Sequence, residues 1–365
     1  MVKARSAPDV WLVLITLLLI GIGVVMVYSA SAVLAFREFG DSYYFVKRQA
    51  LFATLGLIMM LLMIRVDYHI WMKYAMIGLL ACFILLIVVM IPGIGVVRGG
   101  ARSWLAIGSF GIQPSEFMKI GMIVYLATWL SAADVRIEDG VKGLFPPLGI
   151  LGAAFILIMM QPDLGTGVVL VGASILMLFI AGARIQHLLI LGMIGVAGFV
   201  MLILIAPYRL QRITAFLDPW QDPLGAGYQA IQSLYAIAPG GLVGLGLGHS
   251  RQKYSYLPEP QTDFIFSIIS EELGFIGGCL VLLLFALLIY RGMKIAITAT
   301  DRFGSLVAAG IVGMIAVQVM INIGVVICLF PVTGITLPFI SAGGSSLTLM
   351  LTSIGILLNI SRFSR

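Results

Sequence analysis

The sequence predicts an all-α polytopic membrane protein, a bundle of ten transmembrane helices with a large extracellular loop between the seventh and eighth helices. Three observations lead to this fold class. Of the 365 residues, 61% are hydrophobic and only 10% are charged, whereas soluble domains carry about one quarter charged residues. The mean hydropathy is +1.11. Apolar runs follow one another along the whole chain, so one bundle accounts for a single domain, 1–365.

Each predicted span is an apolar run near the length of about 20 residues that crosses a bilayer. The first follows Lys3 and Arg5 and is long for a signal peptide, so we expect an uncleaved helix, although "SASA" at 29–32 resembles a cleavage site. The second, fourth and fifth runs are short, and only "QPD" at 161–163 separates the fifth from the sixth. The ten predicted spans are 10–31, 49–64, 73–91, 115–132, 144–160, 164–183, 187–206, 263–290, 305–330 and 338–360.

An even number of spans places both termini on one side of the membrane. With the N-terminus inside, twelve of the 22 Lys and Arg residues fall in cytoplasmic segments and five in the opposite short loops. This asymmetry follows the positive-inside rule, so we predict that both termini are cytoplasmic. The net charge of +6 reflects this topology, because no basic run or RNA-binding motif indicates nucleic acid.

Function is expected on the outer face, where the polar segments are richer in glycine, proline and aromatic residues. The longest of them, 207–263, contains enough aromatic and apolar residues to argue against disorder. The cysteines do not indicate a disulfide framework or a zinc site, because Cys82, Cys279 and Cys328 lie within apolar spans and none belongs to a CxxC pair.

The stretch "YLPEPQTDFIFSIISEELGF" (256–275) places acidic residues at the start of the eighth span. The prolines cannot continue a helix, so the helix is predicted to begin near Thr262, a plausible N-cap. At helical spacing, several polar residues share one stripe that we expect to line a cleft open to the outer surface: Asp263, Ser267, Ser270 and Glu271. Asp263 suits a general base there, or it only caps the helix. Glu271 and Glu272 lie deeper and are predicted to be structural, paired with a cation or protonated.

A second pair of charges lies in "IQPSEFMK" (112–119), where Pro114 fits the first helical position. Glu116 and Lys119 are three residues apart and share one helix face. Two interpretations stay open. Lys119 is a cation ready for a phosphate and is oriented by Glu116, or the two residues form a buried ion pair that fixes helix packing.

Other segments at the predicted outer face combine polar and glycine residues. Asp163 in "QPDLGTG" can cap a helix, bind a metal or hold an arginine, with capping favoured. The arginines of "RGGARSW" (98–104) and "YRLQRI" (208–213) can clamp phosphate oxygens or anchor head groups. The run "GGLVGLGLG" (240–248) lacks the strand and the Gly-Lys-Ser/Thr of a nucleotide loop, so it favours close backbone packing. Residues 343–346, "GGSS", are expected to interrupt the last helix where it lines a cavity or to allow close helix packing.

These segments together resemble one family, the SEDS proteins of shape, elongation, division and sporulation, and within it the FtsW and SpoVE branch. The matching stretches run in order along nearly the whole chain: "YSASA", "RSW", "QPSEFMK", "QPDLGTG", "DPWQDPLGAGYQAIQSLYA", "PGGLVGLGLGHSRQKYSYLPEPQTDFIFSIISEELGFIGG", "QVMINIGVV" and "PVTGITLPFIS".

The resemblance implies a ten-helix bundle in a bacterial plasma membrane that polymerises lipid II together with a class B penicillin-binding protein and other division or sporulation membrane proteins. It places the family's essential aspartate at Asp263 and its charged pair at Glu116 and Lys119. Further positions that match family motifs, with less defined roles, are Arg48, Arg102, Gln161, Asp163 and Arg212. Charge on the lipid diphosphate would be stabilised by Lys119 and nearby arginines or by a divalent cation, magnesium or manganese, and otherwise no cofactor is expected.

The hypothesis from the sequence is therefore an inverting peptidoglycan glycosyltransferase in which Asp263 is the base. Two other functions fit parts of the pattern. A transporter that flips lipid II would also have interior charges and broken helices, and a scaffold for division proteins would need no catalytic carboxylate.

Overall fold

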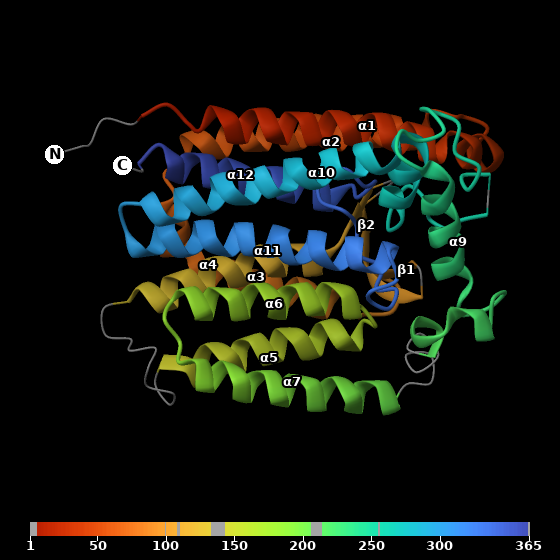
Figure 1. Cartoon of the computed structure of the whole chain (residues 1–365). Coiled ribbons are helices and arrows are strands. Elements are labelled where there is room, and N and C mark those ends of the chain that lie inside the picture. Colours follow the sequence, from red (N-terminus) through yellow and green to blue (C-terminus); the bar gives the residue numbers. More distant parts are fainter. Residues whose placement is uncertain are drawn as a thin grey trace.

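The structure is a computed structural model that describes residues 6–98, 100–107, 110–132, 143–205, 214–254 and 256–363. Its long helices lie side by side along one axis (Figure 1). The first and last described residues meet at one end, where the Ser6 amide donates a hydrogen bond of 3.0 Å to the Arg362 carbonyl. A small sheet and helix α9 lie at the opposite end (Figure 1). We call these the terminal end and the loop end; termini at one end agree with an even number of passes.

A helix occupies each of the ten predicted spans. The boundaries shift by several residues: α1 continues to Phe39 and ends at Gly40 in the left-handed conformation (φ 71°), and α10 continues to Thr298. These helices are α1 Val10–Phe39, α2 Tyr44–Arg65, α3 His69–Val88, α4 Pro114–Ser131, α5 Phe145–Met160, α6 Leu164–Ile180, α7 Ile185–Ile205, α10 Ile265–Thr298, α11 Arg302–Val326 and α12 Ser345–Ser361.

Within the described residues, five helices are long and apolar enough to cross a membrane by themselves, namely α1, α2, α3, α10 and α11. Four more helices contain shorter apolar runs, namely 145–160 in α5, 164–180 in α6, 185–198 in α7 and 345–361 in α12. The chain is thus a multi-pass membrane protein, as predicted from its composition. That all ten helices cross the bilayer stays a prediction.

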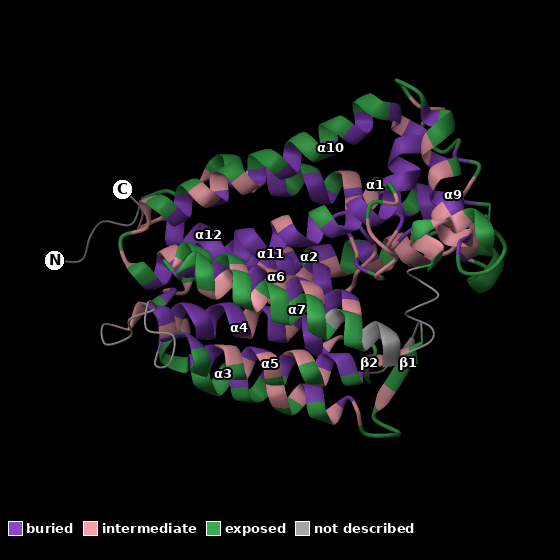
Figure 2. Cartoon of the chain, turned by 60° about the horizontal axis from the view of Figure 1, so that its bottom comes forward, coloured by how far each residue is buried: buried purple, intermediate pink, exposed green. Residues whose placement is uncertain are grey.

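Helix α11 forms the centre of the bundle. In its most apolar window 83% of residues are buried, against 17% in α3, and α11 packs against α4, α6, α10 and α12. Figure 2 shows buried residues concentrated on α11, α12 and α4, with exposed ones on the outward faces of α3, α7 and α10. Polar side chains on α11 therefore face other helices, which matters for the site below.

Residues 95–112 form a sheet that the sequence interpretation treated as a loop. Its strands are β1 Gly95–Arg98, β2 Ala101–Ile107 and β3 Phe110–Ile112, paired antiparallel in the order β1-β2-β3. A tight turn at Gly100 (φ 82°) joins the first two strands. The signal for these strands was present in short runs of β-branched and aromatic residues between glycines.

Two predicted helix starts are wrong. Helix α10 begins at Ile265 and not near Thr262, which does not cap it, because the residues before it are held by another segment. Ser341 Oγ donates to the Thr262 carbonyl (2.6 Å), and the Ala342 amide donates to the Gln261 carbonyl (2.9 Å). The last helix begins at Ser345 and not at residue 338, since residues 338–341 form turns and hold the residues before α10.

The long loop-end segment is structured where it is described, as its composition predicted. It contains η2 Pro219–Gln221, α9 Tyr228–Ile237 and η3 Ala238–Gly240. Residues 241–246 then fill a break in α10 at Gly274 (φ 68°). The amides of Leu245 and Gly246 donate to the carbonyls of Glu271 and Glu272, each at 3.0 Å. This close backbone contact confirms the packing predicted for "GGLVGLGLG".

Candidate functional site

Asp263 lies at the loop end, in the turn that leads into α10, and is partly exposed. Its backbone carbonyl accepts a hydrogen bond of 2.8 Å from Asn322 Nδ2 on α11. The same nitrogen donates to the Ile335 carbonyl at 2.7 Å. Gly334 lies beside the Asp263 carboxylate, where an added Cβ would be 3.7 Å from Oδ2. The carboxylate therefore faces an extended segment, 331–337, at a point that has no side chain.

The predicted Glu116–Lys119 ion pair is confirmed. Lys119 Nζ lies 2.8 Å from Glu116 Oε1, and the two residues are only 3% and 7% exposed. Ser346 Oγ of α12 donates to Glu116 Oε2 (2.9 Å), and Lys119 Nζ donates to Gln318 Oε1 of α11 (3.0 Å). These contacts join α4, α11 and α12, so the pair stabilises the packing of three helices.

Two amides of α11, which the sequence interpretation left without a role, complete the site. Gln318 accepts from Lys119 and donates through Nε2 to the Thr336 carbonyl at 3.0 Å. Asn322 holds Asp263 as described above. The signal was present in "QVMIN", where two amides stand one helical turn apart in an otherwise apolar span, and polar groups inside a membrane usually have a function.

Asp163 caps α6, as favoured from the sequence. Its Oδ1 accepts from the Thr166 amide (3.1 Å), and its Oδ2 accepts from Gln113 Nε2 (2.8 Å) and Ser115 Oγ (3.2 Å). Asp163 stands in the turn before the helix. Desolvation raises the pKa of its carboxyl group above the ordinary value, while the bonds from Thr166 and Gln113 oppose the rise and the charge of Glu116 adds to it.

The remaining predicted site residues make contacts of their own or lie outside the described part. Arg48 on α2 donates to the Tyr44 hydroxyl at 2.8 Å, and Arg102 is partly buried on β2. Gln161 is buried and donates through Nε2 to the Leu86 carbonyl (3.0 Å). Ser267 is fully buried and shares a hydrogen bond of 2.8 Å with Ser233 of α9, which is a packing contact. Arg212 lies outside the described residues.

Glu271 and Glu272 belong to a separate buried cluster. Glu272 Oε1 lies 3.3 Å from Lys253 Nζ, and Ser29 Oγ of α1 donates to the Glu272 carboxylate at 2.7 Å. Glu271 accepts from Ser250 Oγ (2.5 Å) and from the Arg251 amide (2.8 Å). The prediction that these carboxylates are structural, with a cation beside them, is confirmed for Glu272. The cluster attaches the loop-end segment and α1 to α10.

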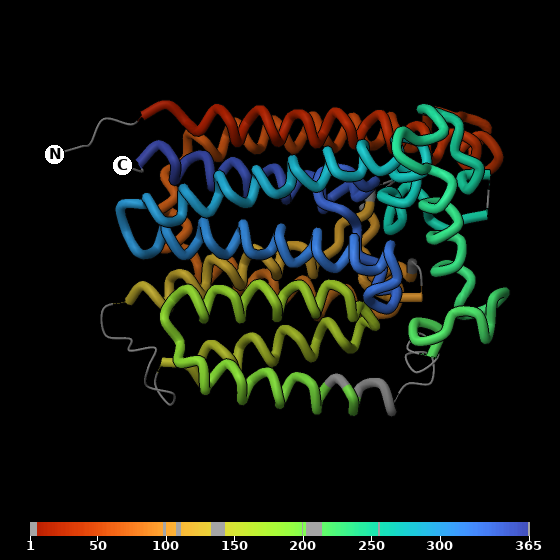
Figure 3. Tube along the Cα trace, in the orientation of Figure 1, coloured from red at the N-terminus to blue at the C-terminus, as the bar shows by residue number. Residues whose placement is uncertain are grey.

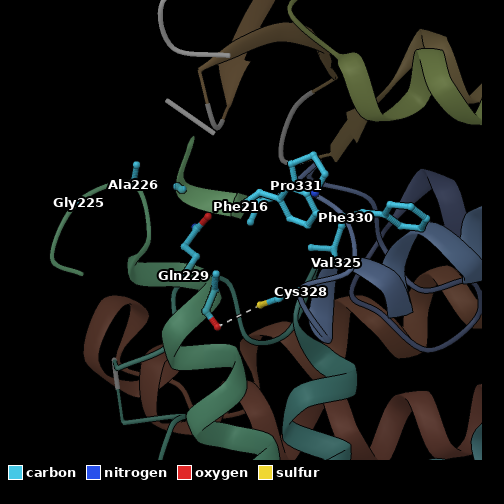
Figure 4. A pocket seen from close by; sticks show the side chains of 11 residues that line it. Phe216, Gly225, Ala226, Gln229, Val325, Cys328, Phe330 and Pro331 are labelled. Carbon is cyan, nitrogen blue, oxygen red and sulfur yellow. Dashed lines mark hydrogen bonds between the residues drawn. The ribbon is translucent and has the colours of Figure 1, made fainter. Parts of the chain in front are cut away.

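A cavity of about 290 Å³ opens at the loop end between α9 and the chain that follows α11. Figure 4 shows Phe216, Val325, Phe330 and Pro331 around it, with Gln229 as the labelled amide. Cys328 Sγ donates to the Ala230 carbonyl at 3.7 Å. The lining continues to Val332, so the cavity adjoins the 331–337 segment that passes Asp263. Its size is at the lower end of small-molecule pockets.

In the described part of the chain, no three His, Cys, Asp or Glu residues gather as a metal site. Carboxylate oxygen such as that of Asp263 is a donor that magnesium and manganese accept. Magnesium commonly takes only one or two carboxylates from the protein and its other ligands from substrate phosphates and water. Asp263 therefore provides a donor of the type that such a cation takes from a protein.

The sequence of the chain matches a known family. A family model for FtsW, RodA and SpoVE, described as "Cell cycle protein", matches residues 10–365. The chain belongs to this family. Stage V sporulation protein E of Bacillus subtilis (strain 168) is 60% identical to it over the full length of both chains. A probable peptidoglycan glycosyltransferase FtsW of Geobacter sp. (strain M18) is 43% identical, covering 97% of this chain and 96% of that one.

Solved structures of FtsW/RodA/SpoVE relatives share the fold. Rod shape determining protein RodA of Thermus thermophilus has a TM-score of 0.73 and 27% identity, covering 98% of this chain and 97% of that one. A chain from a structure described as "Structural coordination of polymerization and crosslinking by a peptidoglycan synthase complex" has a TM-score of 0.82 and 31% identity, covering 98% of both chains. The family predicted from the sequence motifs is thereby confirmed.

Proposed function

We propose that this chain is a peptidoglycan glycosyltransferase that polymerises lipid II into glycan strands at the outer face of the plasma membrane. The observation that carries the proposal is similarity over the whole length, at 43% identity, to a probable peptidoglycan glycosyltransferase FtsW. A partly exposed carboxylate at the loop end, Asp263, supports it, since glycosyl transfer needs a base that an acceptor hydroxyl can reach.

In the proposed reaction, Asp263 takes the proton from the 4-hydroxyl of the acceptor sugar. That oxygen forms a bond to the anomeric carbon of the donor, and the bond from this carbon to the lipid diphosphate breaks. One carboxylate acting as a base suits a single inverting displacement, whereas a double displacement needs a nucleophile as well. Gly334, which has no side chain, leaves room beside the carboxylate for the acceptor.

Charge that develops on the diphosphate needs cations. Arg48 and Arg102 at the loop end are the proposed clamps, together with Arg212, because guanidinium binds phosphate oxygens in a bidentate fork. Lys119 is buried and bonded to Glu116 and Gln318. In this proposal it acts through the electrostatic field that its charge produces at the site. A magnesium or manganese ion bound to the diphosphate would neutralise further charge, and Gln161, Asp163 and Ser267 would shape the surrounding site.

The proposed setting is a bacterial plasma membrane with the loop end outside and both termini in the cytoplasm. A class B penicillin-binding protein is the proposed partner. Its support is the 0.82 TM-score to a chain of a peptidoglycan synthase complex. The 60% identity to a stage V sporulation protein, above the 43% to FtsW, favours spore cortex synthesis over division.

The test is polymerisation of purified lipid II in detergent, with and without the cognate penicillin-binding protein and with a chelator. Polymer from the wild type and none from folded D263N is the expected result. A flippase has no leaflet to cross in detergent and would make no polymer, and neither would a scaffold. Undiminished polymer from D263N would remove the assigned base.

A further inference from the structure

Asn322 and Gln318 stand one turn apart on α11 and are 1% and 2% exposed. At 1.5 Å per residue their α-carbons are about 6 Å apart along the helix axis. Their hydrogen bonds go to two adjacent carbonyls of the extended segment, Ile335 for Asn322 (2.7 Å) and Thr336 for Gln318 (3.0 Å). The two amides therefore fix the position of that segment along α11.

Each amide also contacts one of the two charged positions of the site. Asn322 donates to the backbone of Asp263 at 2.8 Å, and Gln318 accepts from Lys119 at 3.0 Å. The same short stretch of α11 thus connects the start of α10, the middle of α4 and the 331–337 segment. Among the five long apolar helices α11 is the most buried, so it supports these contacts from inside the bundle. The chain that passes between α11 and α12 at the loop end can be followed in blue in Figure 3.

The amide group of Asn322 is chemically required for this arrangement. An amide nitrogen has two hydrogens, and here both are used, one for each of two carbonyls from separate segments. An aspartate of the same shape has no donor when ionised and would place its oxygens against two carbonyl oxygens. The orientation of the amide is also fixed, since the flipped form would create the same repulsion.

We infer that Asn322 and Gln318 are positioning residues on α11 that hold Asp263 in a fixed relation to Lys119 and fix the carbonyls of Ile335 and Thr336 beside them. This inference rests on the proposed function. Misplacement of a catalytic group by about 1 Å can cost about 100-fold in rate. Loss of the Asn322 amide should therefore lower kcat while lipid II still binds.

The experiment compares N322D, N322A and Q318M with wild type in the detergent assay, with kcat and KM measured separately. The matched control is N359D. Asn359 is also a fully buried asparagine, and its amide attaches α12 to the turn between α2 and α3, accepting from the Tyr68 amide (3.0 Å) and donating to the Ile64 carbonyl (2.7 Å). It lies at the terminal end, far from Asp263 in the bundle. Size-exclusion profiles and thermal midpoints identify the folded fraction of each variant.

We expect kcat per folded molecule to fall about 10- to 100-fold in the Asn322 variants and about tenfold in Q318M, with KM within about threefold of wild type. N359D should lose thermal stability but keep its kcat. Where N322D does not fold, N322A, which introduces no charge, is judged by the same criteria.

Wild-type kcat per folded molecule in the Asn322 variants would overturn the inference. An equal fall of kcat in N359D, or a rise in KM that accounts for the whole loss, would do the same. Failure of the proposed function is distinguishable, since then the wild type itself makes no polymer or D263N is as active as wild type.

Discussion

Lys119 Nζ and Glu116 Oε1 are 2.8 Å apart inside the bundle, with neither residue more than 7% exposed. Removing one partner of a buried pair leaves an uncompensated charge, which costs about 3–5 kcal/mol. K119M should therefore lower the free energy of unfolding by about that amount. The double variant E116Q/K119M should be more stable than K119M alone. Thermal unfolding in detergent checks both, and a wild-type midpoint in K119M would contradict the pairing.

Gly274 and Gly278 offer a matched pair of substitutions on α10. At Gly274, φ is 68° and a Cβ would lie 2.3 Å from the Gly244 nitrogen, a backbone atom that cannot move aside. At Gly278 the nearest atom would be at 3.5 Å, an ordinary contact. G274A should lose at least about 2 kcal/mol of stability, since strained backbone alone costs about 1–3 kcal/mol. G278A should stay near wild type. Equal midpoints for the two variants would show that the break in α10 is not fixed by the 241–246 segment.

The pH dependence of stability should reveal the partly buried carboxyl group of Asp163. Its pKa is raised in the folded chain, mainly by desolvation, so the folded state binds the proton more tightly than the unfolded state. This contribution to stability is full below the unfolded pKa of about 3.9 and is lost as pH rises through the folded pKa. D163N mimics the neutral form. We expect the midpoint of D163N minus that of wild type to increase from about pH 4 towards neutrality, and a constant difference would count against the shift.

Ser29 and Ser31 on α1 allow a comparison between a hydrogen bond that joins two helices and one that stays within a helix. Ser29 Oγ donates to the Glu272 carboxylate at 2.7 Å, and Ser31 Oγ donates to the Val27 carbonyl at 2.6 Å in its own helix. A hydrogen bond to a charged group contributes about 1.5–3 kcal/mol. S29A should therefore destabilise the protein by about that amount and S31A by less. Denaturant titration of both variants tests the difference, which should shrink in an E272Q background because the acceptor there is neutral.

The proposed orientation is open to a labelling test in whole cells. In a variant whose native cysteines are replaced by alanine, L224C places a thiol on the loop end, where Leu224 is 89% exposed. T300C places one on the exposed turn between α10 and α11 at the terminal end. A membrane-impermeant maleimide should label L224C in intact protoplasts and T300C only after lysis. The reverse pattern would put the termini outside.

The helical fold was predictable from hydropathy, because long apolar runs in lipid have few alternatives to a helix. The boundaries were not, where polar contacts from other segments compete with helix formation. Thr262 was predicted to be the N-cap, but its carbonyl accepts a hydrogen bond from Ser341. Thr262 precedes α11 in the sequence and Ser341 follows it. Contacts between segments that far apart leave no trace in a local pattern.

The candidate site was predictable in part. Asp163 as a cap and Glu116 with Lys119 are local arrangements that helix geometry alone indicates. Gln318 and Asn322 are visible as polar residues in "QVMIN". Their partners, however, are carbonyls of a segment whose path the sequence does not define. The motif resemblance pointed to Asp263 as the base, which stays a prediction, whereas the backbone contact that holds this residue required the fold.

The bond between Ser29 and Glu272 spans 243 residues of chain. The first helix is complete long before the ribosome reaches the second partner, so the Ser29 hydroxyl waits in the membrane for its acceptor during most of translation. The buried cluster at the break in α10 therefore cannot close before residue 272 of the 365 has been made, while α11 and α12 are still to follow.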